Sequence, residues 1–130
     1  MPLHVSSEPA SAVEAFLESS ATASRPSFLV VYASRGADGQ SWCGDCRDAE
    51  PVVNSKFADG EAVVKIVYAG QRDEWRSAEN PWRRAPFSIT NLPTLVKVAG
   101  DGRWERLVEA DVANQEKLDA FVGDAQRGSR

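Results

Sequence analysis

Two short runs of mostly apolar residues constrain the fold more than any other feature of this sequence. Residues 27–34 read SFLVVYAS and residues 62–70 read AVVKIVYAG, and both runs are rich in β-branched and aromatic side chains. Such a run is too short for a buried helix but has the length of a strand covered on both faces. The sequence therefore predicts two buried strands.

Helical patterns precede and separate these two strands. The apolar residues Val13, Phe16 and Leu17 recur at helical spacing, which predicts a first helix of about three turns. Between the strands, residues 43–57 carry an apolar stripe and contain Pro51. We therefore expect a second helix that bends at this proline.

The second half of the chain begins with a polar segment, residues 71–88, which predicts a long connection that contains a short helix near residues 81–85. Residues 94–98 and 104–109 are expected to be antiparallel strands, because the AGDGR sequence between them suits a tight hairpin. A last helix should follow, capped by Asp111 or by Asn114.

This order of elements implies an α/β fold with a mixed central sheet and helices on both faces. The length of 130 residues and the 42% of hydrophobic residues suit one domain. We expect its core at about residues 8–122, followed by a polar tail. The net charge of −4 argues against a nucleic acid or an anionic membrane as a partner, because both demand a surplus of cations.

The cellular location is predicted from the apolar content of the N-terminus. It has no basic start followed by an apolar run, and the longest apolar stretch in the chain is FLVVYA, residues 28–33. We therefore expect neither export nor membrane anchoring, and a cytosolic protein. The cytosol keeps thiols reduced, so paired cysteines there are more often catalytic or metal-binding than a structural bridge.

The two cysteines of the chain, Cys43 and Cys46, form a CxxC pair at the expected start of the second helix. The unsatisfied N–H groups and the positive end of the helix dipole favour a thiolate at Cys43 over the thiol. Cys46, one turn later, is close enough to attack a mixed disulfide formed at Cys43. The spacing therefore predicts a nucleophile at Cys43 and a resolving thiol at Cys46.

A metal half-site or a passive disulfide bridge is the alternative interpretation of this pair. Structural zinc usually has four ligands, and the sequence holds no second CxxC. The only histidine, His4, falls in an N-terminus that we expect to be frayed. We therefore predict no metal.

At this point the chain resembles a known fold. The chain resembles the thioredoxin fold, a three-layer α/β/α sandwich, in three features. These are a strand followed by WCxxC, Pro51 eight residues after the first cysteine, and LPT at residues 92–94 before a hairpin. Within this fold, the chain is similar to the 14 kDa thioredoxin-related (thioredoxin domain-containing protein 17) family. The similarity lies in the SWCGDC motif, the lengthened RGADGQ loop before it and the tryptophan-containing connection before LPT.

Asp45 departs from the thioredoxin pattern WCGPC, which has proline at this position. Its carboxylate is expected to raise the pKa of Cys46 by like-charge repulsion or to relay a proton. The alternative is a solvated acid that merely favours the helix dipole. Thioredoxins also carry a buried acid in the preceding strand, where this chain has only Val30 and Val31, so Asp45 is a candidate substitute.

The resemblance implies a substrate-binding surface formed by Trp42, Gly44, Leu92, Pro93 and Thr94. In the family Pro93 is cis and faces the dithiol, which exposes neighbouring backbone groups to an extended substrate; the alternative is that Pro93 starts an edge strand. Trp42 is expected to shield the thiolate and to form a flat docking face, or else to be a plain core tryptophan.

The function expected from the residues and the resemblance is that of a cytosolic thiol-disulfide oxidoreductase, a protein-disulfide reductase. The resemblance implies re-reduction by NADPH through thioredoxin reductase, with no cofactor bound to the chain itself. It also implies that the substrates are small or exposed disulfides such as cystine and S-modified thiols. We expect a monomer.

The alternative function is a non-catalytic adaptor that binds proteins through the Trp- and Arg-rich connection. In this connection cationic and aromatic residues alternate, a pattern typical of nucleic-acid binding in a basic protein. Acidic residues lie among them, so we expect instead a solvated connection whose tryptophans pack on the core. The residues concerned are Arg72, Trp75, Arg76, Trp82, Arg83 and Arg84.

Overall fold

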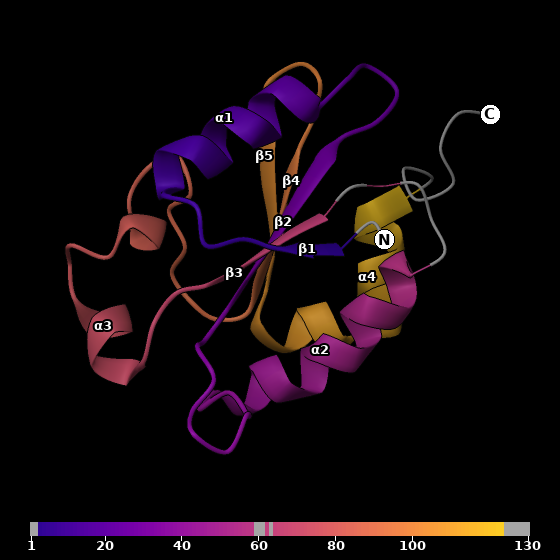
Figure 1. Cartoon of the computed structure of the whole chain (residues 1–130). Helices are drawn as coiled ribbons and strands as arrows, with labels where there is room; N and C mark the ends of the chain where they lie inside the picture. The colour runs from indigo at the N-terminus through magenta and orange to yellow at the C-terminus, as the bar shows by residue number, and fades with distance from the viewer. Residues whose placement is uncertain (1–2, 59–61, 63, 124–130) are drawn as a thin grey trace.

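The computed structural model describes residues 3–58, 62 and 64–123, and their strands form one five-stranded sheet in the order β1-β3-β2-β4-β5. In Figure 1 the sheet is seen almost edge-on, with α1 on one face and α2 and α4 on the other. The predicted three-layer α/β/α fold is confirmed. The strands are β1 Leu3–Val5, β2 Ser27–Tyr32, β3 Val64–Tyr68, β4 Thr94–Val98 and β5 Trp104–Val108. The helices are α1 Ala10–Ser20, α2 Gly44–Phe57, α3 Arg72–Arg76 and α4 Gln115–Val122, with short 3-10 helices η1 Pro81–Arg83 and η2 Glu109–Ala113.

The central strand is β2, and all six of its residues are buried. It pairs in parallel with β3, where Val30 faces Ile66, and antiparallel with β4, where Val30 faces Leu95. A strand with partners on both edges and helices on both faces has no polar side, which explains its unbroken apolar sequence. β4 and β5 form the predicted antiparallel hairpin.

Helix α2 packs on β2 through residues spaced three and four apart, which share one helix face. Its buried residues are Cys46, Ala49, Val53 and Phe57. The ring of Phe57 lies 5.3 Å from the ring of Phe28 on β2, measured between centroids. Pro51 lies inside α2 and is exposed, and the bend expected there stays a prediction.

Three elements were not predicted from the sequence: β1, α3 and the short 3-10 helix η2. β1 pairs in parallel with the edge of β3, so the expectation of a frayed segment at His4 was wrong: His4 faces Lys65 across the strand pair. The reason is that a three-residue edge strand depends on the neighbouring backbone rather than on a pattern of its own. α3 lies within the expected long connection, where Gln71 and Glu74 form a capping box.

The last helix is capped by Asn114, whose side chain accepts a hydrogen bond from the Lys117 N–H. Asp111 instead lies in η2 and pairs with the Lys117 ammonium at 3.0 Å. The polar tail beyond Gly123 is outside the described residues. None of the helices within residues 3–58 and 64–123 has the length and apolar content to cross a bilayer.

Candidate active site

The dithiol lies where β2 ends and α2 begins. Cys43 is the N-cap of α2, and its Sγ accepts a hydrogen bond from the Cys46 N–H at 3.3 Å. The Cys43 thiol also lies 3.5 Å from the Leu92 carbonyl oxygen, to which it donates. Cys43 is partly exposed and Cys46 is fully buried, and neither is in a disulfide. The sulfur that the sequence assigned as the nucleophile is therefore the one that solvent reaches.

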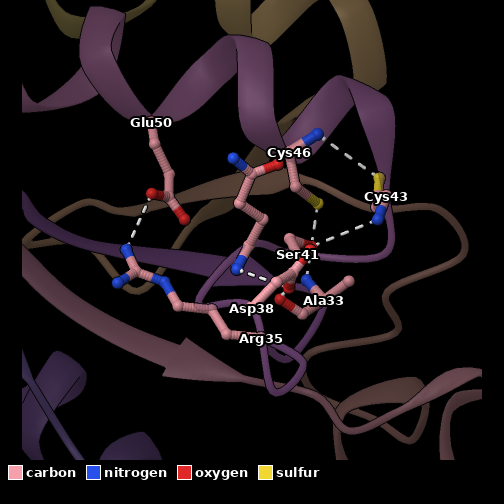
Figure 2. A network of polar contacts seen from close by, with 8 residues as sticks. Ala33, Arg35, Asp38, Ser41, Cys43, Cys46 and Glu50 are labelled. Atoms are coloured by element: carbon pink, nitrogen blue, oxygen red, sulfur yellow. Dashed lines mark hydrogen bonds and ion pairs between the residues drawn. The ribbon is translucent and has the colours of Figure 1, made fainter.

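Cys46 lies one helical turn further, against the end of β2. Its Sγ accepts a hydrogen bond from the Ala33 N–H at 3.4 Å (Figure 2). Burial is the largest influence on this thiol, and it raises the pKa of Cys46 above its ordinary value because a thiolate is poorly solvated there. The Ala33 hydrogen bond opposes this effect but does not cancel it. Cys46 is therefore held as the neutral thiol in the reduced protein.

Ser41 connects the end of β2 to the dithiol, and the sequence analysis missed it. Its hydroxyl donates to the Ala33 carbonyl oxygen at 3.0 Å and accepts from the Cys43 N–H at 3.2 Å (Figure 2). Ser41 is only 3% exposed, and its backbone forms a bridge with Arg35 that closes the loop between them. A serine just before a Trp-Cys pair was the only sequence signal for this role.

Trp42 is partly buried and has fixed partners on both sides. Its indole N–H donates to the Gly70 carbonyl oxygen at 3.0 Å. The guanidinium of Arg72 lies 4.9 Å from the centre of its ring, within the range of a cation–π contact. Trp42 therefore lies beside Cys43 with its ring held in place, but its role in docking stays a prediction.

The LPT segment lies against the dithiol, as the resemblance implied. The Leu92–Pro93 peptide bond is cis, and the Leu92 carbonyl oxygen is the atom that contacts Cys43. Thr94 is buried and donates its hydroxyl to the Asn91 carbonyl oxygen at 2.7 Å. Pro93 precedes β4 rather than starting it, and β4 is an interior strand between β2 and β5. The edge-strand alternative for Pro93 is therefore wrong.

Asp45 and Gly44 lie in the first turn of α2. Asp45 is partly exposed, and within residues 3–58 and 64–123 no hydrogen bond or ion pair to its carboxylate is found. Val30 and Val31 are both fully buried where thioredoxins carry an acid. The role of Asp45 stays a prediction.

The Trp- and Arg-rich connection is ordered by contacts of its own. Trp82 is buried and meets Phe87 edge to face at 4.9 Å between ring centres. Trp75 packs against the same core, and the Arg83 guanidinium lies 5.5 Å from the centre of its ring. Packing of these tryptophans on the core, as expected, is confirmed.

No group of three or more His, Cys, Asp and Glu side chains placed to hold a metal ion occurs within the described part of the chain. The two thiols therefore stand as the chemically distinctive groups of this site.

Comparison with known proteins agrees with this geometry. The sequence profile described as "Thioredoxin domain-containing protein 17-like, thioredoxin domain" matches residues 7–124. The chain is 44% identical over 72 residues to a thioredoxin-like protein Clot of Arabidopsis thaliana, a match that covers 53% of this chain and 54% of that protein. It is 33% identical over 99 residues to the thioredoxin domain-containing protein 17 of Mus musculus, covering 75% of this chain and 77% of that protein. Among solved structures, a Schistosoma mansoni thioredoxin pre-protein superposes with a TM-score of 0.63 at 18% identity, covering 93% of this chain and 98% of that one, which shows the fold.

Proposed function

The chain belongs to the thioredoxin domain-containing protein 17-like family, whose thioredoxin fold supports thiol-disulfide oxidoreductase chemistry in general, and from this we propose that it is a protein-disulfide reductase. The observation that carries the proposal is the unequal exposure of the two thiols. Cys43 is open to a substrate, while Cys46 is fully buried one helical turn behind it.

In the first step, the Cys43 thiolate attacks one sulfur of a substrate disulfide. A bond forms between that sulfur and Cys43, and the other substrate sulfur leaves with the electron pair and takes up a proton. The Cys46 N–H, 3.3 Å from the Cys43 sulfur, stabilises negative charge on the attacking atom.

In the second step, Cys46 gives up its proton and attacks the Cys43 sulfur. The Cys43–Cys46 disulfide forms, and the second substrate sulfur leaves as a thiolate that is then protonated. The substrate has gained two electrons and two protons. The chain supplied both electrons and the proton of Cys46, and the other proton came from solvent, replacing the one that Cys43 released when its thiolate formed. Because burial raises the pKa of Cys46, this step needs a base, and the Asp45 carboxylate in the same helical turn is our candidate.

A further reductant must return the oxidised chain to the dithiol. We assign this role to thioredoxin reductase with NADPH. The substrates that we assign are cystine, other small or exposed disulfides and S-modified thiols. We assign the reaction to the cytosol and to a monomer. The reductase and the substrates are supported by family membership alone. The location and the monomeric state carry over from what we expected of the sequence.

The test is NADPH oxidation coupled through thioredoxin reductase, with cystine as the substrate. Cys43→Ser should abolish turnover. Cys46→Ser should accumulate a mixed disulfide at Cys43, detected by mass spectrometry. Turnover that survives Cys43→Ser, or a substrate trapped on Cys46 instead, would refute the assigned order. If the wild type shows no turnover while a double serine variant still binds protein partners, the adaptor function is favoured instead.

A further inference from the structure

A cavity of about 310 Å³ lies beside the dithiol, between α2 and the loop that precedes it. In Figure 2, Arg35, Glu50 and Ser41 lie on the same side of α2 as the two cysteines. The cavity is open to solvent and predominantly polar in its lining side chains. The residues that line it are Arg35, Gly39, Gln40, Ser41, Arg47 and Glu50.

Arg47 lines this cavity and also lies against the first turn of α2, at Gly44. One of its guanidinium nitrogens, Nη1, donates to the Ser41 carbonyl oxygen at 2.6 Å. The other, Nη2, lies 3.6 Å from the point that a Cβ atom on Gly44 would occupy. Gly44 is the residue directly after Cys43, so the guanidinium lies against the turn that presents the nucleophile. Gly44 has no side chain, so none of its own side-chain atoms lies between its backbone and the cation.

The charge of Arg47 is not matched within the described residues. The other cation of the cavity, Arg35, is paired with Glu50 at 2.7 Å, so these two charges compensate each other. Asp38, in the same loop, accepts from the Gln40 N–H at 3.0 Å and does not line the cavity. Arg47 is exposed, bonds to a neutral carbonyl and makes no ion pair within residues 3–58 and 64–123, so it retains donors and a full charge.

We infer that this cavity is a subsite for a carboxylate group carried by the disulfide substrate, with Arg47 as the residue that binds it. The inference rests on the proposed function and specifies its substrate class. In a disulfide of cysteine, the carboxylate is three covalent bonds from the sulfur. A substrate sulfur engaged by Cys43 therefore carries its carboxylate to within reach of a guanidinium beside Gly44. Arginine suits this ligand because its planar fork matches the two carboxylate oxygens.

The experiment compares two disulfides that differ only in this group. Cystine carries two carboxylates and two ammonium groups, whereas cystamine carries the two ammonium groups alone. Reduced protein is mixed with each disulfide, and its oxidation is followed by tryptophan fluorescence, which requires no reductase. The quantity measured is the ratio of the second-order rate constants for cystine and cystamine.

The variants are Arg47→Gln and a control, Arg103→Gln. Glutamine removes the charge of Arg47 and keeps an amide donor, on a side chain two bonds shorter than that of arginine. Arg103 lies in the exposed hairpin between β4 and β5, at the opposite end of the sheet from the dithiol, and its loss changes the net charge by the same amount. We expect Arg47→Gln to lower the cystine-to-cystamine ratio about tenfold, a typical effect for one charged hydrogen bond. Arg103→Gln should leave the ratio within about twofold of the wild type.

The outcomes separate the inference from the proposed function. If both disulfides oxidise the wild type and Arg47→Gln leaves their ratio unchanged, the function stands and the subsite is refuted. An equal fall in both rate constants would mean that Arg47 only supports the Ser41 segment, which also overturns the subsite. If neither disulfide oxidises the wild type, the proposed function is wrong and the subsite falls with it.

Discussion

Replacing Ser41 with alanine tests whether the loop before the dithiol is held by one hydroxyl group. The Ser41 side chain is 3% exposed and makes two hydrogen bonds, to the Ala33 carbonyl oxygen at 3.0 Å and from the Cys43 N–H at 3.2 Å. Alanine fits the same space but leaves both backbone groups without this partner.

The expected cost follows from the two orphaned groups. A buried polar group without a partner costs about 1–3 kcal/mol. The Ala33 carbonyl oxygen belongs to a fully buried residue and should carry most of that cost, whereas Cys43 is partly exposed, so water compensates its N–H in part. We therefore expect Ser41→Ala to lower the free energy of unfolding by about 2–4 kcal/mol, out of the roughly 5–15 kcal/mol typical of a domain.

The assay is urea unfolding of the reduced protein, followed by the fluorescence of its four tryptophans. With a slope of about 1–3 kcal/mol per molar urea, the midpoint should fall by roughly 1–3 M. The matched control is Ser55→Ala on the exposed face of α2, which should change the free energy of unfolding by no more than about 0.5 kcal/mol. If the two variants unfold at the same urea concentration, the hydroxyl of Ser41 does not hold the loop and the reasoning is wrong.

Three further predictions follow from burial and close contact elsewhere in the fold. Tyr32→Phe should raise the free energy of unfolding by about 1 kcal/mol in urea titration, because the buried Tyr32 hydroxyl has no hydrogen-bond partner within the described residues; a loss of stability would contradict this. Between pH 7.5 and 9.5 the free energy of unfolding of the wild type should fall by about 1 kcal/mol more than that of Cys46→Ala. Burial raises the pKa of Cys46 in the folded protein, so only the unfolded chain releases this proton as the pH rises past about 8.5. Parallel pH profiles of the two proteins would contradict this. Gly100→Ala should lower the thermal midpoint by at least about 5 °C in a calorimetric scan, because the added Cβ would lie 2.3 Å from the Thr22 carbonyl carbon. The control Gly36→Ala should leave the midpoint unchanged, because its nearest atom would lie 3.5 Å from the added Cβ. Equal midpoints for the two variants would contradict the expected clash.

The central part of the fold was predictable because local sequence encodes it. The apolar run at residues 27–34 has one stable position in an α/β protein, the middle of the sheet, and β2 occupies it. The CxxC pair before an apolar stripe placed Cys43 at the start of α2. The hairpin of β4 and β5 followed from a turn sequence between two strand patterns.

Other elements carry too little local signal. β1 has three residues, and its backbone is satisfied by β3, which follows about sixty residues later in the chain. α3 has five residues, none of them buried, so it has no apolar periodicity to detect. Both elements depend on neighbouring segments that the local sequence pattern does not indicate.

The sequence by itself determined where the two sulfurs lie: one helical turn apart, at a helix start that follows a buried strand. Only the tertiary structure decided how those sulfurs differ. Cys43 meets a carbonyl 49 residues away in the chain, at Leu92, and Cys46 meets the N–H of Ala33, 13 residues away. Exposure and solvation depend on which distant segments pack around an atom, and short-range spacing specifies neither. The physical difference between an open thiol and a buried one therefore arises from the packing of α2 on β2.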